Sequence, residues 1–403
     1  MALMSFQPPK GTDDILAPES QLWRRILKLW EEMSARYGYP LMLLPVFEST
    51  ELFARGVGET TDVVTKQMYS FPDKSGRSLS LRPEGTAGAV RAYLNRGGQA
   101  VFKGAYSGPM FRYEQPQAGR RRQFYQVGVE YMGVSSSEAD IEVIELGWRF
   151  VAAAGVDAEL RLNNLGDAEC RPGYLADLRA YLNERRTELP DSMASMIDAN
   201  PLRILDSGPE AVAASAPRFE DYWCRPCRDH HDAVLAALDS LGIPYISDHT
   251  LVRGLDYYTR TAWEYIGLGL KGAQNAVGGG GRYDDLAETL GGKPAPGLGF
   301  ALGVDRIAAV STLDPDPEIE VFVVSETGPK EALHAASRLR GEGVGVDFDA
   351  EARSVKAQLR TAGRRGVPHL MIVRGDDIVE VRSGGERRQM PLREVASWIR
   401  GSS

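Results

Sequence analysis

The residues richest in chemical groups lie between Leu251 and Glu264. This short stretch contains Arg253, Asp256 and the adjacent pair Tyr257 and Tyr258. A core strand does not carry so many polar groups without partners, because each buried and unpaired group costs a few kcal/mol. The stretch therefore either lines a site or is strongly solvated.

Two further arginines suit contact with phosphate. Arg112 follows the apolar pair Met110-Phe111 at the expected end of a strand, where a fixed guanidinium can bind phosphate through two hydrogen bonds. Arg306 follows a glycine-rich segment, residues 297–303, whose small residues let the backbone approach a ligand. An ion pair with Asp305 at a helix start is the other interpretation of Arg306. The triplet 120–122 suits either a ligand or a solvated hairpin tip.

Carboxylates and an amide follow the same expected sheet. Glu84 and Thr86 come just after a strand, and Gln126 and Glu130 share one face of another by the period of two. Such a set could bind an α-ammonium group and a small polar side chain, or it could be a solvated sheet face. The glycine run 278–281 indicates close packing of the backbone against a ligand.

The common nucleotide loops are absent. The chain has no G-x-x-x-x-G-K-[ST] motif, and Leu302 stands where a dinucleotide fingerprint would have its third glycine. If the protein binds a nucleotide, we expect it to use an antiparallel sheet, arginines and glycine backbone.

The three cysteines pose a separate question. Cys224 and Cys227 are followed by His230 and His231, but these ligand types crowd into one turn, and Cys170 is distant in the sequence. Closed zinc sites more often pair two separated doublets of ligands, so we expect no protein-bound metal, with zinc as the alternative. A sparse, odd number of cysteines fits a reducing compartment.

Composition limits the class of protein. The chain has 403 residues, of which 43% are hydrophobic and 25% charged, and a formal net charge of −8. These values indicate a globular protein of two or three domains and argue against a charge-driven nucleic-acid binder. The N-terminus lacks an apolar run of signal-peptide length, and no stretch is long enough to span a membrane. We expect a cytoplasmic protein.

The pattern of elements predicts a division of the chain. Residues 19–37 show helical spacing, 41–47, 79–81 and 100–107 look like strands, and 110–131 look like a long hairpin. After residue 317, strands and helices alternate, which predicts a small α/β domain with parallel strands. We expect a catalytic core at 1–165 and 246–312, a mostly helical insertion at 166–245, a linker at 313–317 and a C-terminal domain at 318–403.

A basic stripe is expected in the last domain. Arg353, Lys356, Arg360 and Arg364 recur at intervals of three and four residues, so they would share one helix face. Such a stripe could bind a nucleic-acid backbone or be a solvated face.

These motifs together resemble class II aminoacyl-tRNA synthetases, and among them the histidyl-tRNA synthetase family. The resemblance runs from residues 9–13 to the C-terminal domain. The three class II motifs match the segment ending near Pro45, residues 111–130 and residues 297–306, and the histidine-specific matches are residues 251–258 and 280–284. The resemblance implies an α+β fold: a class II synthetase antiparallel-sheet catalytic domain with a helical insertion, plus a C-terminal α/β anticodon-binding domain.

The resemblance also implies roles for individual residues. Arg112 and Arg253 would be catalytic, and ATP would be held by Arg112, Glu114 and Arg306. The implied histidine-binding residues are Glu84, Thr86, Arg112, Gln126, Glu130, Arg253, Tyr257, Tyr258 and Tyr283. The implied tRNA contacts are Gln117, Arg120, Arg353, Lys356, Arg360 and Arg364. The hairpin loop departs from the family, because Gln115 replaces its usual arginine and Ala118 a common basic residue.

The implied activity is that of a histidine–tRNA ligase, which uses ATP with Mg²⁺ on its phosphates. The implied partners are L-histidine, tRNA(His) and a second copy of the chain, joined through the first class II motif. The main alternative is a catalytically inactive regulatory subunit of ATP phosphoribosyltransferase. A class II enzyme for another amino acid and a plain tRNA-binding module are less consistent with the tyrosine pair, Arg306 and the glycine run.

Overall fold

The structure is a computed structural model, and it describes residues 6–58, 61–98, 100–114, 120–255, 257–270, 275–375 and 377–401. The chain divides into two compact units. The first comprises Met1–Asp14 and Ile26–Leu313, and the second comprises Ile15–Arg25 and Asp314–Ser403. Each unit is described below by itself.

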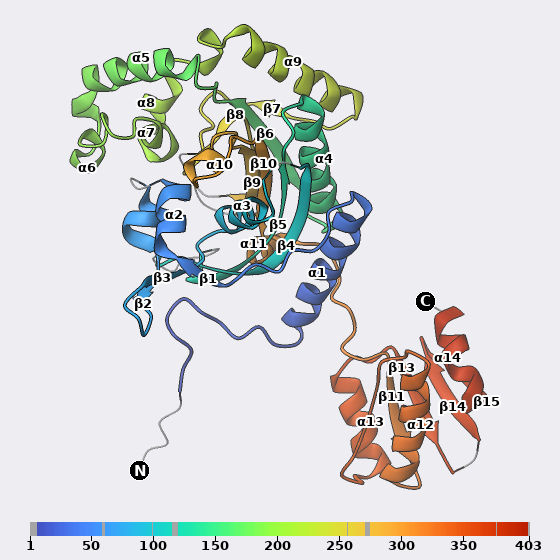
Figure 1. The fold of residues 1–403 in the computed structure, drawn as a ribbon. Coiled ribbons are helices and arrows are strands. Elements are labelled where there is room, and N and C mark those ends of the chain that lie inside the picture. Colours follow the sequence, from blue (N-terminus) through green and yellow to red (C-terminus); the bar gives the residue numbers. More distant parts are fainter. Residues whose placement is uncertain are drawn as a thin grey trace. The chain divides into compact units, whose positions relative to one another are not determined.

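A seven-stranded sheet organises the first unit (Figure 1). Its strand order is β4-β5-β10-β9-β8-β6-β7, and all neighbours are antiparallel except β6 and β7. The strands are β4 (Phe102–Phe111), β5 (Gln123–Met132), β6 (Ala158–Asn164), β7 (Ile246–Ser247), β8 (Thr259–Gly267), β9 (Ala276–Arg282) and β10 (Gly297–Gly303). The antiparallel sheet expected from the sequence is confirmed.

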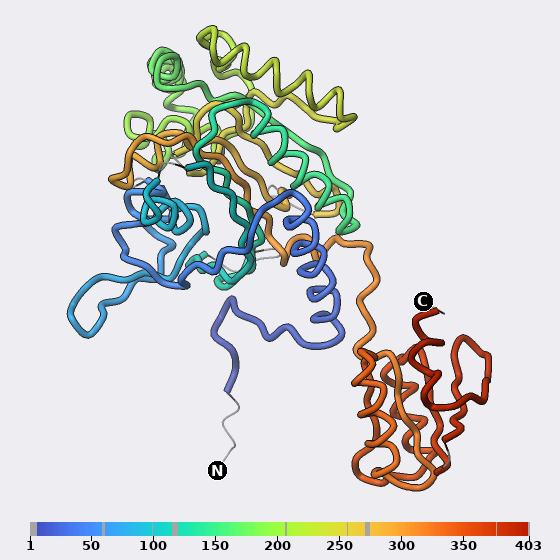
Figure 2. The backbone as a smooth tube through the Cα atoms, turned by 45° about the vertical axis from the view of Figure 1, so that its right-hand side comes forward, coloured from blue at the N-terminus to red at the C-terminus, as the bar shows by residue number. Residues whose placement is uncertain are grey.

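Helices and a smaller sheet complete this unit. Figure 1 shows α4 along one side of the large sheet and α2 and α3 together on another part of the unit, and the backbone tube in Figure 2 follows the same path. The helices are α1 (Glu19–Arg36), of which residues 26–36 belong to this unit, α2 (Thr50–Val57), α3 (Thr86–Asn95), α4 (Ser137–Ala153), α10 (Leu286–Thr289) and α11 (Val304–Val310), with a π-helical turn at Val63–Gln67. The small antiparallel sheet has the order β1-β3-β2, with β1 (Phe47–Ser49), β2 (Ser70–Pro72) and β3 (Ser78–Leu81).

The segment between β6 and β7 is helical, as its alanine-rich composition predicts. It contains α5 (Arg171–Glu184), α6 (Asp191–Ala194), α7 (Leu202–Ser207), α8 (Glu210–Ala214) and α9 (Arg225–Ser240), with 3₁₀ turns at Arg186–Glu188 and Phe219–Asp221. Its apolar core includes Tyr174 stacked on Phe219, and extends to Val252 and Tyr258 of the stretch that precedes β8. The insertion therefore packs against residues expected at the site.

The second unit has a mixed five-stranded sheet of order β12-β11-β13-β14-β15. Its elements are β11 (Val321–Ser325), α12 (Pro329–Gly341), β12 (Val346–Phe348), α13 (Val355–Arg364), β13 (His369–Val373), β14 (Ile378–Ser383), β15 (Glu386–Pro391) and α14 (Leu392–Gly401). β11 pairs in parallel with β12 and β13, whereas β14 and β15 are antiparallel. The expectation of parallel strands holds only for the first three.

One expected strand is largely absent. Within residues 41–47, only Leu41 forms a bridge, with Ala105, and β1 begins at Phe47. Pro40 and Pro45 lack the N–H groups that a ladder requires. Among the described helices, none combines the length and apolarity needed to cross a bilayer.

Candidate active site

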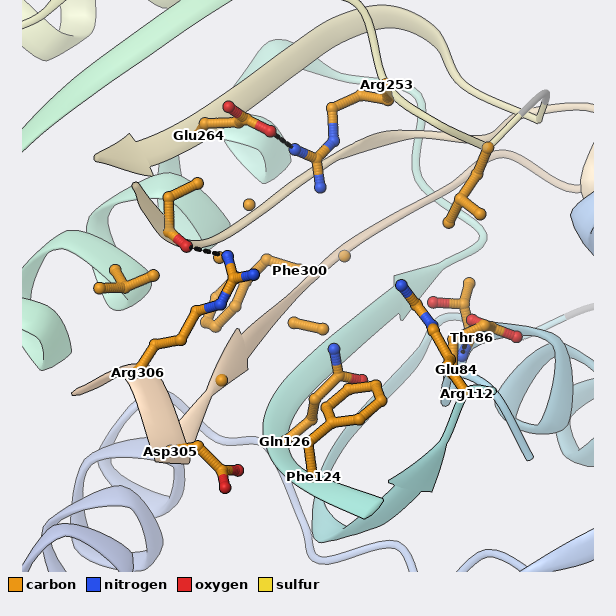
Figure 3. Close-up of a pocket in the computed structure, with 18 of the residues that line it drawn as sticks. Glu84, Thr86, Arg112, Phe124, Gln126, Arg253, Glu264, Phe300, Asp305 and Arg306 are labelled. Atoms are coloured by element: carbon orange, nitrogen blue, oxygen red, sulfur yellow. Dashed lines mark hydrogen bonds and ion pairs between the residues drawn. The ribbon is translucent and has the colours of Figure 1, made fainter. Parts of the chain in front are cut away.

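A cavity in the first unit brings together three arginines that are far apart in the sequence. Arg112 directly follows β4, Arg253 lies in the stretch before β8, and Arg306 lies in the first turn of α11. Figure 3 shows the three side chains directed toward a common space over the sheet. Three guanidinium groups on different elements form a site suited to an anionic ligand with several oxygens.

Arg253 is fixed by an ion pair over a glycine. Its Nη1 contacts Glu264 Oε1, and its guanidinium lies 5.7 Å from the centre of the Tyr258 ring. Glu264 pairs with Gly279 across β8 and β9, and a Cβ at Gly279 would lie 2.3 Å from the Trp263 carbonyl oxygen and 3.0 Å from Arg253 Nη1. Glycine at this position therefore leaves room for the guanidinium against the sheet.

Arg112 is oriented by the backbone and by an aromatic ring. Its Nε donates to the Pro83 carbonyl at 2.9 Å, and its guanidinium lies 5.4 Å from the Phe124 ring centre. Burial lowers the pKa of Arg112, although Glu114 and Glu84 nearby oppose that shift. The side chain remains cationic, because even a lowered arginine pKa lies far above neutrality.

Arg306 lies among other cations. Its Nη1 donates to the Ala276 carbonyl at 2.6 Å. Burial lowers its pKa, and the neighbouring charges of Arg120 and Arg112 lower it further. An anion bound here would relieve that repulsion, which indicates a site for phosphate groups.

Asp305, which the helix-start alternative pairs with Arg306, contacts the hairpin of β4 and β5. Its Oδ1 lies 3.2 Å from Arg121 Nη1, and its Oδ2 accepts from the Tyr125 N–H at 2.7 Å. Arg121 also pairs with Asp13 at 3.1 Å. Asp305 thus anchors the hairpin to the start of α11.

The other side of the cavity is polar and less cationic. The carboxylate of Glu84 accepts from the N–H groups of Thr86 at 2.6 Å and Ala87 at 2.9 Å, at the start of α3. Burial raises the pKa of Glu84, and those two backbone hydrogen bonds oppose the shift. Gln126 Oε1 is buried and has no hydrogen-bond partner among the described residues. This side offers acceptors to a ligand that carries donors.

Glu130 and Tyr283 lie beneath this wall and are not among its lining residues. Glu130 is fully buried, and it accepts from Thr86 Oγ1 at 2.8 Å, from Tyr106 at 3.4 Å and from the Tyr283 hydroxyl. Burial raises the pKa of Glu130 to about 8, against the effect of these hydrogen bonds. In this structure Glu130 reaches the cavity through Thr86.

Tyr257 and Tyr258 close the cavity from the side of the insertion. Both line it, and their ring centres are 4.6 Å apart. The Tyr257 ring also makes an edge contact with Tyr283 at 5.7 Å. Asp256, which the sequence places beside them, lies outside the described residues.

The glycine run packs against protein as well as lining the cavity. Gly278 and Gly279 line it, whereas a Cβ at Gly280 would lie 2.1 Å from the Gly299 carbonyl and one at Gly281 would lie 2.5 Å from Tyr258 Cδ1. Of the four glycines, only Gly278 and Gly279 are therefore placed where they could contact a ligand in the cavity.

Sequence reasoning missed two partners of the arginines. Glu264, which pairs with Arg253, and Phe124, which contacts Arg112, both line the cavity. The pairing of Glu264 with Gly279 could have been found only by aligning two strands, and periodicity within one strand does not supply that register.

The expected tRNA contacts are dispersed. Gln117 lies outside the described residues, and Arg120 lines the cavity, where it pairs with Glu114 at 3.2 Å. In the second unit, Lys356, Arg360 and Arg364 are exposed on α13. Arg353 precedes that helix and pairs with Asp349, so the expectation that it shares the helix face is wrong.

The separation of the cysteines in the sequence does not reflect their distance in the structure. Cys170 is distant in sequence, but its Sγ lies 3.8 Å from Cys227 Sγ. His230 and His231 point elsewhere: His230 contacts Asp140 at 3.2 Å, and His231 packs on Trp223.

The antiparallel sheet with arginines after β4 and at the start of α11 defines a class II aminoacyl-tRNA synthetase fold. The histidyl-tRNA synthetase family model matches residues 11–307, and an anticodon-binding domain model matches residues 318–402. The chain belongs to the histidyl-tRNA synthetase family.

Relatives match along the full length. The histidine–tRNA ligase of Anaeromyxobacter dehalogenans is 44% identical over 415 residues, which cover 99% of this chain and 100% of the relative. The histidine–tRNA ligase of Desulforamulus reducens is 40% identical, and the match covers 97% of this chain and 98% of the relative. The crystal structure of apo S. aureus histidyl-tRNA synthetase has a TM-score of 0.78 at 32% identity. The match covers 98% of this chain and 100% of the S. aureus chain. A Bacillus halodurans structure described as an ATP phosphoribosyltransferase regulatory subunit/histidyl-tRNA synthetase is 22% identical, with a TM-score of 0.68, and covers 92% and 99%.

Proposed function

We propose that the cavity of the first unit joins L-histidine to ATP and passes the histidyl group to tRNA(His). As a member of this family, the chain is an ATP-dependent histidine–tRNA ligase. The observation that carries the assignment of residues is the convergence of Arg112, Arg253 and Arg306 opposite Glu84 and Thr86. One side of the cavity suits a polyphosphate, and the other suits an ammonium group and a polar ring.

In the first step, the histidine carboxylate attacks the α-phosphorus of ATP, and pyrophosphate leaves. No protein nucleophile is needed, so the site acts by positioning and by stabilising charge. We assign Arg112 and Arg253 to the α-phosphate and Arg306 to the γ-phosphate, with Glu114 beside the nucleotide. Arg253 is held by Glu264, so its charge is placed before substrate arrives.

Histidine would lie on the acceptor side of the cavity. Glu84 faces the α-ammonium group, and Gln126, Tyr257 and Tyr258 surround the imidazole, which donates at one nitrogen and accepts at the other. Glu130 and Tyr283 act through Thr86 and the tyrosine rings as positioning residues. A site of this kind rejects apolar isosteres because its buried polar groups would remain unpaired.

Mg²⁺ would enter on the phosphate oxygens of ATP. The nearest acidic side chains lining the cavity already have cationic partners, because Glu264 pairs with Arg253 and Glu114 with Arg120. Oxygen ligands from phosphate fit the preference of Mg²⁺ for few protein ligands. When bound, the ion would neutralise charge on the leaving pyrophosphate.

In the second step, the terminal ribose of tRNA(His) attacks the adenylate. We propose a catalytic core at 1–165 and 246–312, a helical insertion at 166–245, and an anticodon-binding domain at 318–403 after a linker at 313–317. Exposed cations on α13 support RNA-backbone contact by that last domain. A reaction that consumes tRNA for protein synthesis favours a cytoplasmic location.

We propose a homodimer through the first class II motif. Three apolar side chains of this segment are exposed: Leu41 by 62%, Leu43 by 85% and Phe47 by 54%. Leu41 forms a bridge with Ala105 of β4, which is the edge strand of the large sheet. Since neighbouring exposed apolar groups often mark interfaces, Leu43→Glu should shift the mass found by light scattering from dimer to monomer. A monomeric unmodified chain would contradict the proposal.

Histidine-dependent exchange of pyrophosphate into ATP tests the catalytic assignment directly. Arg253→Ala should lower the exchange rate by about 100- to 1000-fold, the range for loss of one preorganised charge-stabilising group. Arg149→Ala is the matched control, because Arg149 is exposed on α4 and pairs with Glu145 outside the cavity.

The same assay separates the alternatives. Exchange dependent on histidine alone supports the ligase, and charging of tRNA(His) tests the second step. Exchange with another amino acid would contradict the assigned specificity. No exchange with any amino acid would favour the regulatory subunit.

A further inference from the structure

The insertion joins the sheet at a cluster of three thiols and a carboxylate. Asp167 and Cys170 lie in the connection between β6 and α5, and Cys224 and Cys227 lie at the start of α9. One ligand atom from each residue can be chosen so that all four lie within 4.8 Å of one another. This cluster takes no part in the proposed chemistry of the cavity.

The spacing of these atoms matches the corners of a tetrahedron around zinc. Zn–S bonds of about 2.3 Å place two sulfurs about 3.8 Å apart, and a Zn–O bond of about 2.0 Å places oxygen about 3.5 Å from sulfur. Cys170 Sγ and Cys227 Sγ are 3.8 Å apart. Asp167 Oδ1 lies 3.4 Å from Cys170 Sγ and 3.7 Å from Cys224 Sγ. Three of the six separations are therefore close to those of a coordination shell, and all six lie within 4.8 Å.

Two helix N-termini also lie at the cluster. Cys170 is the N-cap residue of α5 and Cys224 is that of α9, so two helix N-termini face the cluster. The N–H of Asp167 lies 3.3 Å from Cys170 Sγ. Gly166 has φ of +67°, and a Cβ there would lie 2.8 Å from the same sulfur. The glycine thus leaves space beside this sulfur, and the Asp167 N–H offers it a donor.

We propose that Asp167, Cys170, Cys224 and Cys227 bind one Zn²⁺ ion in a structural site. Each thiol would lose its proton to solvent as the metal–sulfur bond forms. Four protein ligands close the tetrahedron and leave no position for substrate, which distinguishes a structural from a catalytic zinc site.

The site would connect the insertion to the wall of the cavity. Asp167 Oδ2 contacts Arg260 Nη2 at 3.2 Å, and Arg171, next to Cys170, donates to the Tyr258 carbonyl at 2.6 Å. Arg260 has φ of +47° and exchanges backbone hydrogen bonds with Leu165 and Gly166. The metal would therefore hold the stretch that carries Tyr258.

Metal content of the full chain tests the proposal independently of activity. The untagged protein, purified under reducing conditions without chelator, should contain one zinc per chain by elemental mass spectrometry. After exchange of zinc for Co²⁺, it should show the intense visible bands of tetrahedral thiolate coordination. Both readouts use the unmodified chain, so they do not depend on the folding of a variant.

Variants then assign the ligands. Cys227→Ser should weaken zinc binding by more than about 100-fold, and Asp167→Asn by about tenfold or more. Glu169→Gln is the matched control, because Glu169 is an exposed neighbour that is not part of the cluster, and it should bind as the unmodified chain does. A metal-free protein that gives no thiolate bands with Co²⁺ would overturn the proposal. So would an intact mass showing a Cys170–Cys227 disulfide in the freshly isolated protein.

Discussion

At the scale of single residues, the site contains buried polar groups that lower the stability of the unliganded fold and are suited to ligand binding. Gln126 Oε1 is buried without a hydrogen-bond partner among the described residues, and Glu130 is a fully buried carboxyl group. Both conditions carry a free-energy penalty in the unliganded chain. Stability and histidine binding should therefore respond in opposite directions to changes at Gln126.

Gln126→Leu should raise the stability of the chain by about 1 kcal/mol while raising the KM for histidine by about tenfold, because it removes an unpaired acceptor that a ligand would use. Denaturant unfolding and pyrophosphate exchange at varied histidine concentration measure the two effects. Thr261→Val is the control: Thr261 Oγ1 is also buried and unpaired within the described chain, but Thr261 does not line the cavity. It should gain stability with an unchanged KM. A lower KM in Gln126→Leu would contradict the assignment.

Glu130 should make stability depend on pH. Burial raises its pKa from 4.5 to about 8, so the folded chain retains a proton that the unfolded chain releases in that range. Stability is then highest below the unfolded pKa and falls as pH rises from about 4.5 to about 8. In Glu130→Gln this fall should be smaller, as urea unfolding at a series of pH values would show.

The control for Glu130→Gln is the same substitution at a solvent-exposed glutamate. Glu210→Gln changes an exposed side chain at the start of α8, and its stability should fall with pH as steeply as that of the unmodified chain. An equal slope in Glu130→Gln would mean that other groups, such as Glu84, dominate the titration.

At the scale of elements, the glycine run shows why backbone spacing matters for the cavity. A Cβ at Gly280 would lie 2.1 Å from the Gly299 carbonyl and 2.7 Å from Phe300 Cβ, within the pairing of β9 and β10. Because backbone atoms cannot move aside cheaply, Gly280→Ala should destabilise the chain by about 3 kcal/mol or more. Denaturant unfolding of the full chain measures this loss of stability.

A second glycine serves as the control for the same chemical change. At Gly173, in α5, an added Cβ would meet only Tyr222 Cδ1 at 3.6 Å, an ordinary contact. Gly173→Ala should therefore be neutral or stabilise by up to about 1 kcal/mol, the helix preference of alanine. Equal destabilisation by both changes would indicate that strand spacing does not explain the glycine run.

The elements differ in how well the sequence predicted them. Apolar runs located β4 and β5, but the apolar run 41–47 forms only an isolated bridge, since prolines interrupt its ladder. β15 was missed because its residues are charged and exposed, as suits an edge strand. The proximity of Cys170 to Cys227 depends on how β6, α5 and α9 pack, which no spacing within one segment reveals.

At the scale of the whole molecule, charge is distributed unevenly. The chain has a net charge of −8, yet residues 318–403 contain 14 Lys/Arg and 13 Asp/Glu. Within that part, α13 exposes Lys356, Arg360 and Arg364 at helical spacing. Local cations on an otherwise acidic chain allow contact with one polyanion without general affinity for nucleic acid.

The two reaction steps should therefore respond differently to a change in the second unit. The triple charge reversal Lys356→Glu, Arg360→Glu and Arg364→Glu should leave histidine-dependent pyrophosphate exchange unchanged, because none of these residues lines the cavity. It should raise the KM for tRNA(His) in charging. The salt dependence of tRNA binding should weaken by about one in logarithmic slope for each phosphate that the variant no longer neutralises. Filter binding over a range of salt concentrations gives that slope.

A control variant separates the effect of net charge on tRNA binding from the effect of where the charges lie. The triple reversal Arg387→Glu, Arg388→Glu and Arg393→Glu makes the same change in charge at exposed residues of β15 and α14. If α13 contacts the RNA backbone, this control keeps the slope of the unmodified chain, because distant charges are screened over about 10 Å at moderate salt. If both variants show the same reduction in slope, long-range attraction accounts for tRNA binding and the α13 face is not the contact. A loss of pyrophosphate exchange in either variant would instead show that the second unit acts on the chemical step.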